Sequence, residues 1–166
     1  MIVMKFGGTS VESSVAMNRV ADIVSARIAN GAVVVVSAMG KTTNRLLAMA
    51  NAAVSGDRAT ALQQAKELRE MHLAETPATV HEAIVSHFDE LSELLKSMSV
   101  LGEMTPRTVD LISSYGERLS SLAFAAVLQS RGINATHVDS REVIVTDTRH
   151  TAAAPLFELT NGRLQE

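Results

Sequence analysis

Two short apolar runs, separated by a helical pattern, constrain the fold of this chain more than any other feature. Residues Ile2–Phe6 predict a short buried strand, and Ala32–Val36 form an apolar, largely β-branched run that suits a central parallel strand covered on both faces. Between them, apolar residues recur at helical spacing: Val11, Val15, Val20, Val24 and Ile28. The order strand, helix, strand predicts a right-handed βαβ crossover and an α/β fold.

The turn after the first strand, K-F-G-G-T-S at Lys5–Ser10, carries more glycine and charge than a plain strand-to-helix turn needs. Gly7 and Gly8 would let backbone N–H groups approach an anion, and the helix N-terminus would add partial positive charge. Lys5 would add a full charge, and its place inside an apolar strand favours function, because a buried lysine needs a reason. The segment predicts a phosphate cradle. The alternative is a tight turn with a surface lysine.

The turn after the second strand, S-A-M-G-K-T-T-N at Ser37–Asn44, lies along the same edge of the predicted sheet, where ligands of open parallel sheets bind. It resembles a P-loop, but a P-loop needs glycine where Val35 stands. Lys41 is therefore interpreted as a solvated loop residue. Ser37 and Thr43 offer compact donors and acceptors near a helix start, with helix capping as the alternative.

Polar residues and glycines mark the ends of the predicted helices. Thr9 and Glu12 form a capping box for the first helix, and Gly31 is placed to stop it. Asp57 can cap the next stretch, which Pro77 interrupts. The stretch that follows carries an amphipathic stripe: Val80, Ile84, Phe88, Leu91, Leu95 and Met98. The two stretches predict a helical hairpin over roughly residues 57–100.

A long helix is predicted to start at Thr105-Pro106, and its interior contains S-Y-G-E-R at Ser114–Arg118. Gly116 costs about 1 kcal/mol relative to alanine inside a helix. It also thins the helix beside Glu117, so that a ligand or another backbone could come close. Glu117 could accept a charge-assisted hydrogen bond from an ammonium group. The alternative is that Glu117 and Arg118 are ordinary solvent-exposed residues with no role in binding.

Beyond the long helix, Ile133–Val138 predicts a third strand followed by Asp139, and Val143–Val145 predicts a short fourth strand. After Thr146 the pattern fades into a polar, mixed segment.

Composition narrows the function. The chain has 166 residues, 46% hydrophobic and 20% charged, which is typical of one ordered globular domain. It has 0 Cys, a net charge of -3 and 3% aromatics, which argue against disulfides, nucleic-acid partners and stacking platforms. Without a membrane-spanning run or a signal peptide, we expect a cytoplasmic protein with no membrane partner. Five histidines show no metal-ligand spacing: His72, His81, His87, His137 and His150.

Taken together, four motifs in order resemble one family. They are K-F-G-G-T-S at Lys5–Ser10, V-V-V-S-A-M-G-K-T-T-N at Val34–Asn44, S-Y-G-E-R at Ser114–Arg118 and V-D-S-R-E-V-I-V at Val138–Val145. This set resembles the aspartokinases of the amino-acid kinase superfamily, over nearly the whole chain. The resemblance implies a three-layer α/β/α sandwich with a mainly parallel central sheet, of the amino-acid kinase or carbamate kinase type, represented by its N-terminal half.

The resemblance also implies an activity and residue roles. Aspartokinases transfer the ATP γ-phosphoryl group to the β-carboxylate of L-aspartate, giving 4-phospho-L-aspartate for lysine, threonine and methionine biosynthesis. Carried over by motif, Lys5 would act catalytically by neutralising charge on the transferring phosphate. The phosphate and nucleotide contacts would come from Lys5, Gly7, Gly8, Thr9 and Ser10. The aspartate contacts would come from Ser37 and Thr43, and from Glu117 at the α-ammonium.

The resemblance further implies that residues 1–166 are the N-terminal portion of the catalytic domain, without the C-terminal nucleotide-binding half and the ACT domains. We therefore expect a truncated fragment that is not active alone. ATP would bind with Mg²⁺ as a substrate complex, mostly outside this chain, and the full-length protein would be a homo-oligomer. Two alternatives stay open: a non-catalytic binding or assembly module, and an amino-acid kinase for another carboxylate.

Overall fold

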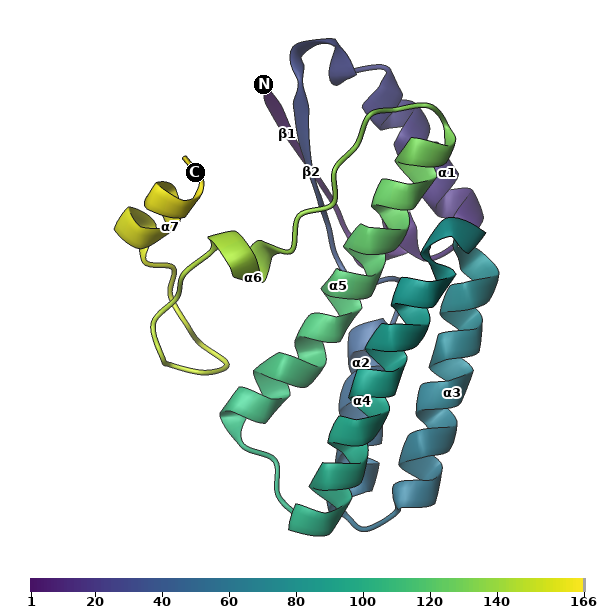
Figure 1. The fold of residues 1–166 in the computed structure, drawn as a ribbon, viewed down its shortest axis with the longest axis vertical. Helices are drawn as coiled ribbons and strands as arrows, with labels where there is room; N and C mark the ends of the chain where they lie inside the picture. The colour runs from purple at the N-terminus through teal and green to yellow at the C-terminus, as the bar shows by residue number, and fades with distance from the viewer. Residues whose placement is uncertain (166) are drawn as a thin grey trace.

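The predicted βαβ unit forms the top of the molecule in Figure 1. The computed structural model describes residues 1–165, apart from the side chain of residue 30; the expected boundary at residue 166 lies outside them. Strands β1 (Ile2–Phe6) and β2 (Ala32–Val36) pair in parallel, with Ile2 opposite Ala32 and Phe6 opposite Val36. Helix α1 (Ser14–Ser25) connects them, so the parallel α/β unit is confirmed.

The entry to α1 differs from the sequence prediction. A short 3-10 turn, η1 (Gly8–Val11), follows β1, and α1 begins only at Ser14, with the Ser13 side chain accepting from the Ala16 N–H at 3.2 Å. The predicted capping box from Thr9 to Glu12 is therefore wrong, because the extra turn moves the helix start beyond both residues. The predicted stop at Gly31 is also displaced, since α1 ends at Ser25 and Gly31 (φ 73°) closes a second 3-10 turn, η2 (Ile28–Asn30).

The two faces of the sheet are buried very differently. Met4 and Val36 point into a core formed with α1 and α5 (Pro106–Ser130). On the opposite face Val3, Val33 and Val35 are 65%, 45% and 45% exposed, and Lys5 is exposed beside them. Within residues 1–165, the predicted covering of both faces is thus not realised. The predicted buried lysine is also wrong, because strand alternation turns Lys5 away from the Met4 side.

Four long helices pack side by side around a second core that lies mostly below the sheet in Figure 1, and the last of them continues upward beside the sheet. They are α2 (Thr42–Val54), α3 (Arg58–Glu75), α4 (His81–Leu101) and α5. A 3-10 turn, η3 (Ala78–Val80), joins α3 to α4. Two predicted helix starts are confirmed: the Asp57 side chain accepts from the Thr60 N–H, and Thr105 caps α5 with proline at its first position. The shared core lies along the predicted stripe of α4: Ile84, Phe88, Leu91, Leu95 and Met98.

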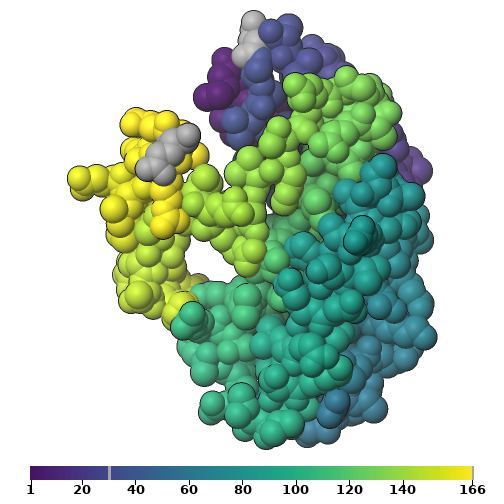
Figure 2. Space-filling model, viewed as in Figure 1, coloured from purple at the N-terminus to yellow at the C-terminus, as the bar shows by residue number. Residues whose placement is uncertain are grey.

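After α5 the chain first runs along the body, where Ile133 and Ala135 pack against the core of the sheet. From α6 onward it forms an arm that stands off the body and leaves a hollow beside it (Figure 2). The two predicted strands here are wrong. Residues 133–139 are irregular in the described structure, Val143 ends a short helix, α6 (Ser140–Val143), and a single bridge joins Thr146 to Pro155. Helix α7 (Phe157–Arg163) follows. An apolar run becomes a strand only when another backbone pairs with it along its length. Within residues 1–165 none does so with Ile133–Val138, and Val145 gains only one backbone hydrogen bond, from the Leu156 N–H at 2.8 Å.

Candidate functional site

The turn after β1 and the turn after β2 touch through glycine. A Cβ added at Gly8 would lie 2.7 Å from the Ala38 carbonyl oxygen and 3.1 Å from that of Gly40. The Gly40 N–H donates to the Gly8 carbonyl at 3.1 Å, and the Ser37 N–H donates to the Phe6 carbonyl at 3.0 Å. Any side chain at position 8 would separate the two backbones. Gly8 therefore brings the K-F-G-G-T-S segment against the segment that carries Ser37.

Helix α5 approaches the same place from the other side. Glu117 Oε1 accepts a hydrogen bond from the Ala38 N–H at 3.2 Å, although the two residues are 79 positions apart. A Cβ at the preceding residue, Gly116, would lie 3.3 Å from Thr43 Oγ1. Three segments distant in sequence thus converge, and the structure places Glu117 beside Ser37-Ala38, with Thr43 against α5.

Helix capping does not account for Ser37 and Thr43. Helix α2 begins at Thr42, its N-cap residue is Lys41, and no side chain makes the capping hydrogen bond. The Thr42 hydroxyl instead donates back to the Met39 carbonyl at 2.6 Å. Ser37 and Thr43 are both half-buried.

The K-F-G-G-T-S segment forms the end of β1 and the turn that follows it. The Ser10 N–H donates to the Gly7 carbonyl at 2.9 Å, which closes η1. Lys5 and Thr9 are exposed and Ser10 is half-buried. Lys5 lies on the exposed face of the sheet, two residues before Gly7.

We expected the N-terminus of α1 to help bind an anion, but a carboxylate of the protein, that of Glu75, already lies there. The Ser14 N–H, in the first turn of α1, donates to Glu75 Oε2 at 2.6 Å. Glu75 is the last residue of α3, 61 positions away. A carboxylate at a helix N-terminus satisfies an orphan N–H and balances the positive end of the helix dipole. The Ser14 N–H is therefore already paired within the protein.

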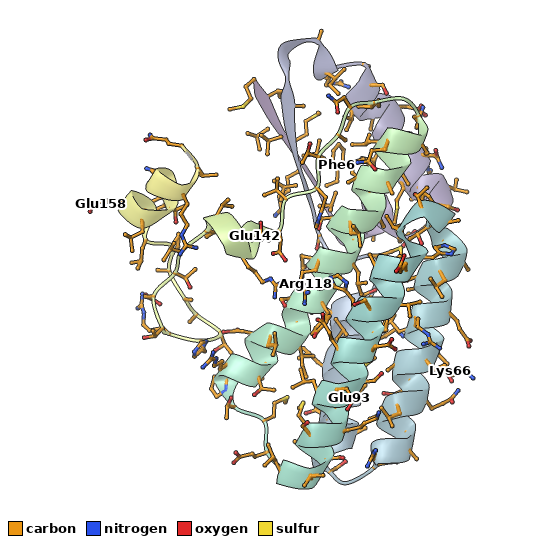
Figure 3. The ribbon with its side chains drawn as sticks, in the orientation of Figure 1. Phe6, Lys66, Glu93, Arg118, Glu142 and Glu158 are labelled. Carbon is orange, nitrogen blue, oxygen red and sulfur yellow. The ribbon has the colours of Figure 1, made fainter. Side chains whose placement is uncertain are left out.

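A polar cluster beside the site was missed by sequence reasoning. Arg118 Nε lies 3.6 Å from Asp139 Oδ2, its Nη2 lies 3.7 Å from Glu90 Oε2, and its guanidinium stands 4.7 Å from the centre of the Tyr115 ring. Figure 3 shows Arg118 projecting from α5 on the side of α6. Hydrogen bonds from Arg141, aided by the charge of Arg118, lower the pKa of Asp139 to about 2. The V-D-S-R motif contains Asp139 and Arg141, but no spacing links them to Arg118.

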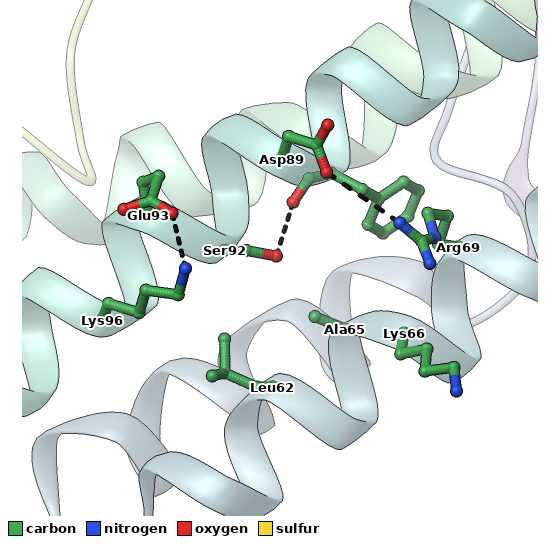
Figure 4. A pocket seen from close by; sticks show the side chains of 9 residues that line it. Leu62, Ala65, Lys66, Arg69, Asp89, Ser92, Glu93 and Lys96 are labelled. Carbon is green, nitrogen blue, oxygen red and sulfur yellow. Dashed lines mark hydrogen bonds and ion pairs between the residues drawn. The ribbon is translucent and has the colours of Figure 1, made fainter.

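A separate groove of about 360 Å³ runs between α3 and α4 (Figure 4). Its charged rim is paired internally: Lys96 with Glu93 at 2.6 Å and Arg69 with Asp89 at 3.9 Å. No lining residue belongs to the three converging segments: Leu62, Ala65, Lys66, Arg69, Phe88, Asp89, Ser92, Glu93 and Lys96. The candidate site is therefore the meeting point of the turns, not this groove. Within residues 1–165, no helix combines the length and apolar character needed to cross a bilayer.

Comparison with known proteins agrees with the fold. Residues 1–163 match the Amino acid kinase family, and the chain belongs to that family. Within it, the chain is 37% identical to Aspartokinase 1, chloroplastic, of Arabidopsis thaliana, over 99% of this chain and 28% of that protein. It is 34% identical to Lysine-sensitive aspartokinase 3 of Escherichia coli (strain K12), over 93% of this chain and 34% of that protein.

Solved structures give the same result. E. coli aspartokinase III in complex with lysine and aspartate superposes with a TM-score of 0.89 at 30% identity, over 99% of this chain and 37% of that chain. The same enzyme in complex with aspartate and ADP superposes with a TM-score of 0.87 at 31% identity. The resemblance to aspartokinases predicted from the motifs is confirmed. The chain spans only about a third of the length of these relatives.

Proposed function

We propose that this chain forms the aspartate-binding side of an aspartokinase, which transfers the γ-phosphoryl group of ATP to the β-carboxylate of L-aspartate. The observation that carries the proposal is the hydrogen bond from the Ala38 N–H to Glu117, which brings the S-Y-G-E-R helix to the turn after β2. It is supported by the similarity to an aspartokinase solved with aspartate and ADP. The product, 4-phospho-L-aspartate, would enter lysine, threonine and methionine biosynthesis.

Glu117 would bind the α-ammonium of aspartate. One of its oxygens accepts from Ala38, and the carboxylate is exposed, so its remaining lone pairs can accept from an ammonium group. The hydroxyls of Ser37 and Thr43 would donate to the substrate carboxylates. Together these groups would fix which carboxylate faces the phosphate.

The K-F-G-G-T-S segment would hold the transferring phosphate. The backbone amides of Gly7 and Gly8, with Thr9 and Ser10 completing the turn, would donate to phosphoryl oxygens, and Lys5 would neutralise the charge that develops on them. A β-carboxylate oxygen of aspartate attacks the γ-phosphorus, and the bond from that phosphorus to the bridging oxygen of ADP breaks. ADP leaves with the bonding electrons. Such transfer depends on alignment and charge stabilisation and needs no protein nucleophile.

ATP would arrive with Mg²⁺ as a substrate complex. We propose that residues 1–166 are the N-terminal portion of the catalytic domain and that most nucleotide contacts come from other parts of that domain. The one-third share of the relatives' length supports this assignment. Transfer activity would then require the whole polypeptide, whereas weak aspartate binding would be measurable on this chain. The expected cytoplasmic location and homo-oligomeric state stay predictions.

The direct test is acyl phosphate formation from ATP, Mg²⁺ and L-aspartate by the whole polypeptide that carries this chain, trapped with hydroxylamine. L-Glutamate and N-acetyl-L-glutamate serve as competing substrates. We expect product with L-aspartate only. Product with another carboxylate instead would assign a different amino-acid kinase, and no product with any of them would favour a non-catalytic module.

Glu117→Gln tests the aspartate contact. The amide oxygen can still accept from the Ala38 N–H, so the fold is retained, but the negative charge that attracts the ammonium is lost. Since a charge-assisted hydrogen bond contributes about 1.5–3 kcal/mol, we expect the KM for L-aspartate to rise by roughly 10- to 100-fold, with the KM for ATP unchanged. Glu103→Gln, in the exposed loop before α5, is the control. An unaltered KM in Glu117→Gln would remove Glu117 from the site.

A further inference from the structure

We propose that Gly116 and Ala38 form a spacer that sets the gap between α5 and the turn after β2, and so positions Glu117 and Thr43 for the substrate. Gly116 is then a positioning residue, since it acts through its neighbours rather than on the substrate. The inference rests on the proposed function, but the contact itself can be measured without any ligand.

The gap at Gly116 is too small for any other residue. A Cβ built there would lie 2.7 Å from Ala38 Cβ, closer than real Cβ atoms approach, and 3.3 Å from Thr43 Oγ1. Ala38 Cβ is bonded directly to the backbone and cannot rotate away, so the helix or the turn would have to shift. Leu46 Cδ1, at 3.7 Å, would be in ordinary van der Waals contact with that Cβ.

Both halves of the spacer are buried. Ala38 is 3% exposed, and Gly116 is buried in the interior of the 25-residue helix α5. Glycine is unfavourable in a helix interior, so a helix this long would be more stable with alanine at position 116 if the space allowed it. A buried helical glycine that faces one methyl group therefore indicates a required close approach.

The substrate-binding groups depend on this approach. Glu117 follows Gly116 and reaches the Ala38 N–H at 3.2 Å, a distance at the limit of an N–H···O bond. Thr43 lies against Gly116 from α2. If the gap widened by even half an ångström, the Glu117 bond would be lost and the carboxylate would move away from Ser37 and Thr43. Misplacement of about 1 Å in a positioning group can cost 100-fold in rate.

The test is a steric rescue with three variants: Gly116→Ala, Ala38→Gly and the double variant. In the ligand-free ¹⁵N-labelled chain, we expect Gly116→Ala to shift the residue 38 amide resonance and to lower its hydrogen-exchange protection at least tenfold. The double variant has the same single Cβ at the contact and is expected to regain most of that protection. Gly162→Ala is the matched control, because a Cβ at this helical glycine of α7 meets nothing within 4 Å.

L-Aspartate binding gives the second measurement. We expect Gly116→Ala to weaken binding at least tenfold, the double variant to recover it to within about threefold, and Gly162→Ala to match the original chain. In the whole polypeptide, the same variants should change the KM for L-aspartate and leave the KM for ATP unchanged. This split would not follow from a purely structural role of Gly116.

Each remaining outcome decides the proposal. An unchanged residue 38 amide in Gly116→Ala, or no recovery in the double variant, overturns the spacer. If Gly116→Ala does not fold, restored folding in the double variant supports the spacer, and continued unfolding contradicts it. If the original chain does not bind aspartate but the amide signal shifts and is rescued, the spacer holds as a contact, and its role in substrate positioning fails with the proposed function.

Discussion

The helical bundle and the two-stranded sheet bury their apolar residues to very different extents. In the bundle, Leu46, Leu91 and Leu95 are 0% exposed, whereas on the open face of the sheet Val3 is 65% exposed. The proposed site residues gather where the sheet ends, with Thr43 and Glu117 on the bundle helices α2 and α5 that reach that end. The difference indicates that the bundle supplies most of the stability, while the sheet leaves one face and its charged residue Lys5 exposed.

The largest effect should come from the sheet and leave stability unchanged. In the whole polypeptide, we expect Lys5→Ala to lower kcat about 100- to 1,000-fold, because one charge-stabilising group contributes about 3–4 kcal/mol to such a transition state. The unfolding midpoint of this chain should not move, since Lys5 is exposed. Lys41→Ala, in the neighbouring turn, is the control for loss of a surface lysine. Normal turnover in Lys5→Ala would refute the role assigned to it.

The next largest effect should come from the bundle, and here stability rather than turnover is expected to fall. Leu91→Ala removes a fully buried side chain from the core that α4 shares with α2, α3 and α5, and truncations of this kind cost about 2–5 kcal/mol. We expect a loss of that size in urea unfolding. Leu101→Ala, at the exposed end of α4, should change stability by less than about 0.5 kcal/mol. If Leu91→Ala and Leu101→Ala lost equal free energy of unfolding, the buried core of the bundle would not be what stabilises the chain.

The stability of the bundle should also depend on pH. His72 is fully buried against Phe88, with ring centres 5.5 Å apart, and burial lowers its pKa below the ordinary 6.5. Its folded pKa is depressed, so the unfolded chain binds more protons as the pH falls. Stability should be complete above about pH 6.5 and decline below it, by up to about 1.4 kcal/mol per pH unit.

The His72 prediction is checked by urea unfolding between pH 7.5 and 5. His72→Leu should reduce this slope, and what remains would come from groups such as His137, whose pKa is also lowered by burial. If His72→Leu were as pH-sensitive as the original chain, another group would be responsible.

The smallest effect should come from the contact that joins the two regions. Glu75→Gln removes the negative charge that the last residue of α3 places at the first turn of α1. A carboxylate at a helix N-terminus contributes about 0.3–1 kcal/mol, and we expect a stability loss of that size that shrinks at high salt. Glu70→Gln, which loses only an exposed pair with Lys66, should cost less. A salt-independent loss in Glu75→Gln would contradict a dipole contribution.

Periodic patterns in the sequence predicted the elements that depend on local rules. The apolar stripe from Val80 to Met98 predicted a helix that runs over His81–Leu101, and Asp57 and Thr105 marked two helix starts correctly. Elements that need a distant partner were predicted less well. Ile133–Val138 has the composition of a strand, yet within residues 1–165 no backbone pairs with it.

The site shows the same division. Glycine and hydroxyl motifs in the sequence singled out the K-F-G-G-T-S turn, the turn after β2 and the S-Y-G-E-R helix as places for chemistry. No local pattern contained the contacts that join them, such as Glu117 with Ala38 across 79 positions and Glu75 with Ser14 across 61. Nor did any pattern show that Lys5 would face outward on its strand.

By itself, then, the sequence determined the βαβ unit, the helical hairpin, the family and the three segments that carry the proposed site. Only the tertiary structure decided that these segments meet, that Gly116 faces one methyl group of Ala38, and that a carboxylate from α3 occupies the start of α1. The physical reason is range: helix periodicity and capping act within a few residues, whereas steric fit and hydrogen bonds between elements depend on how the whole chain packs.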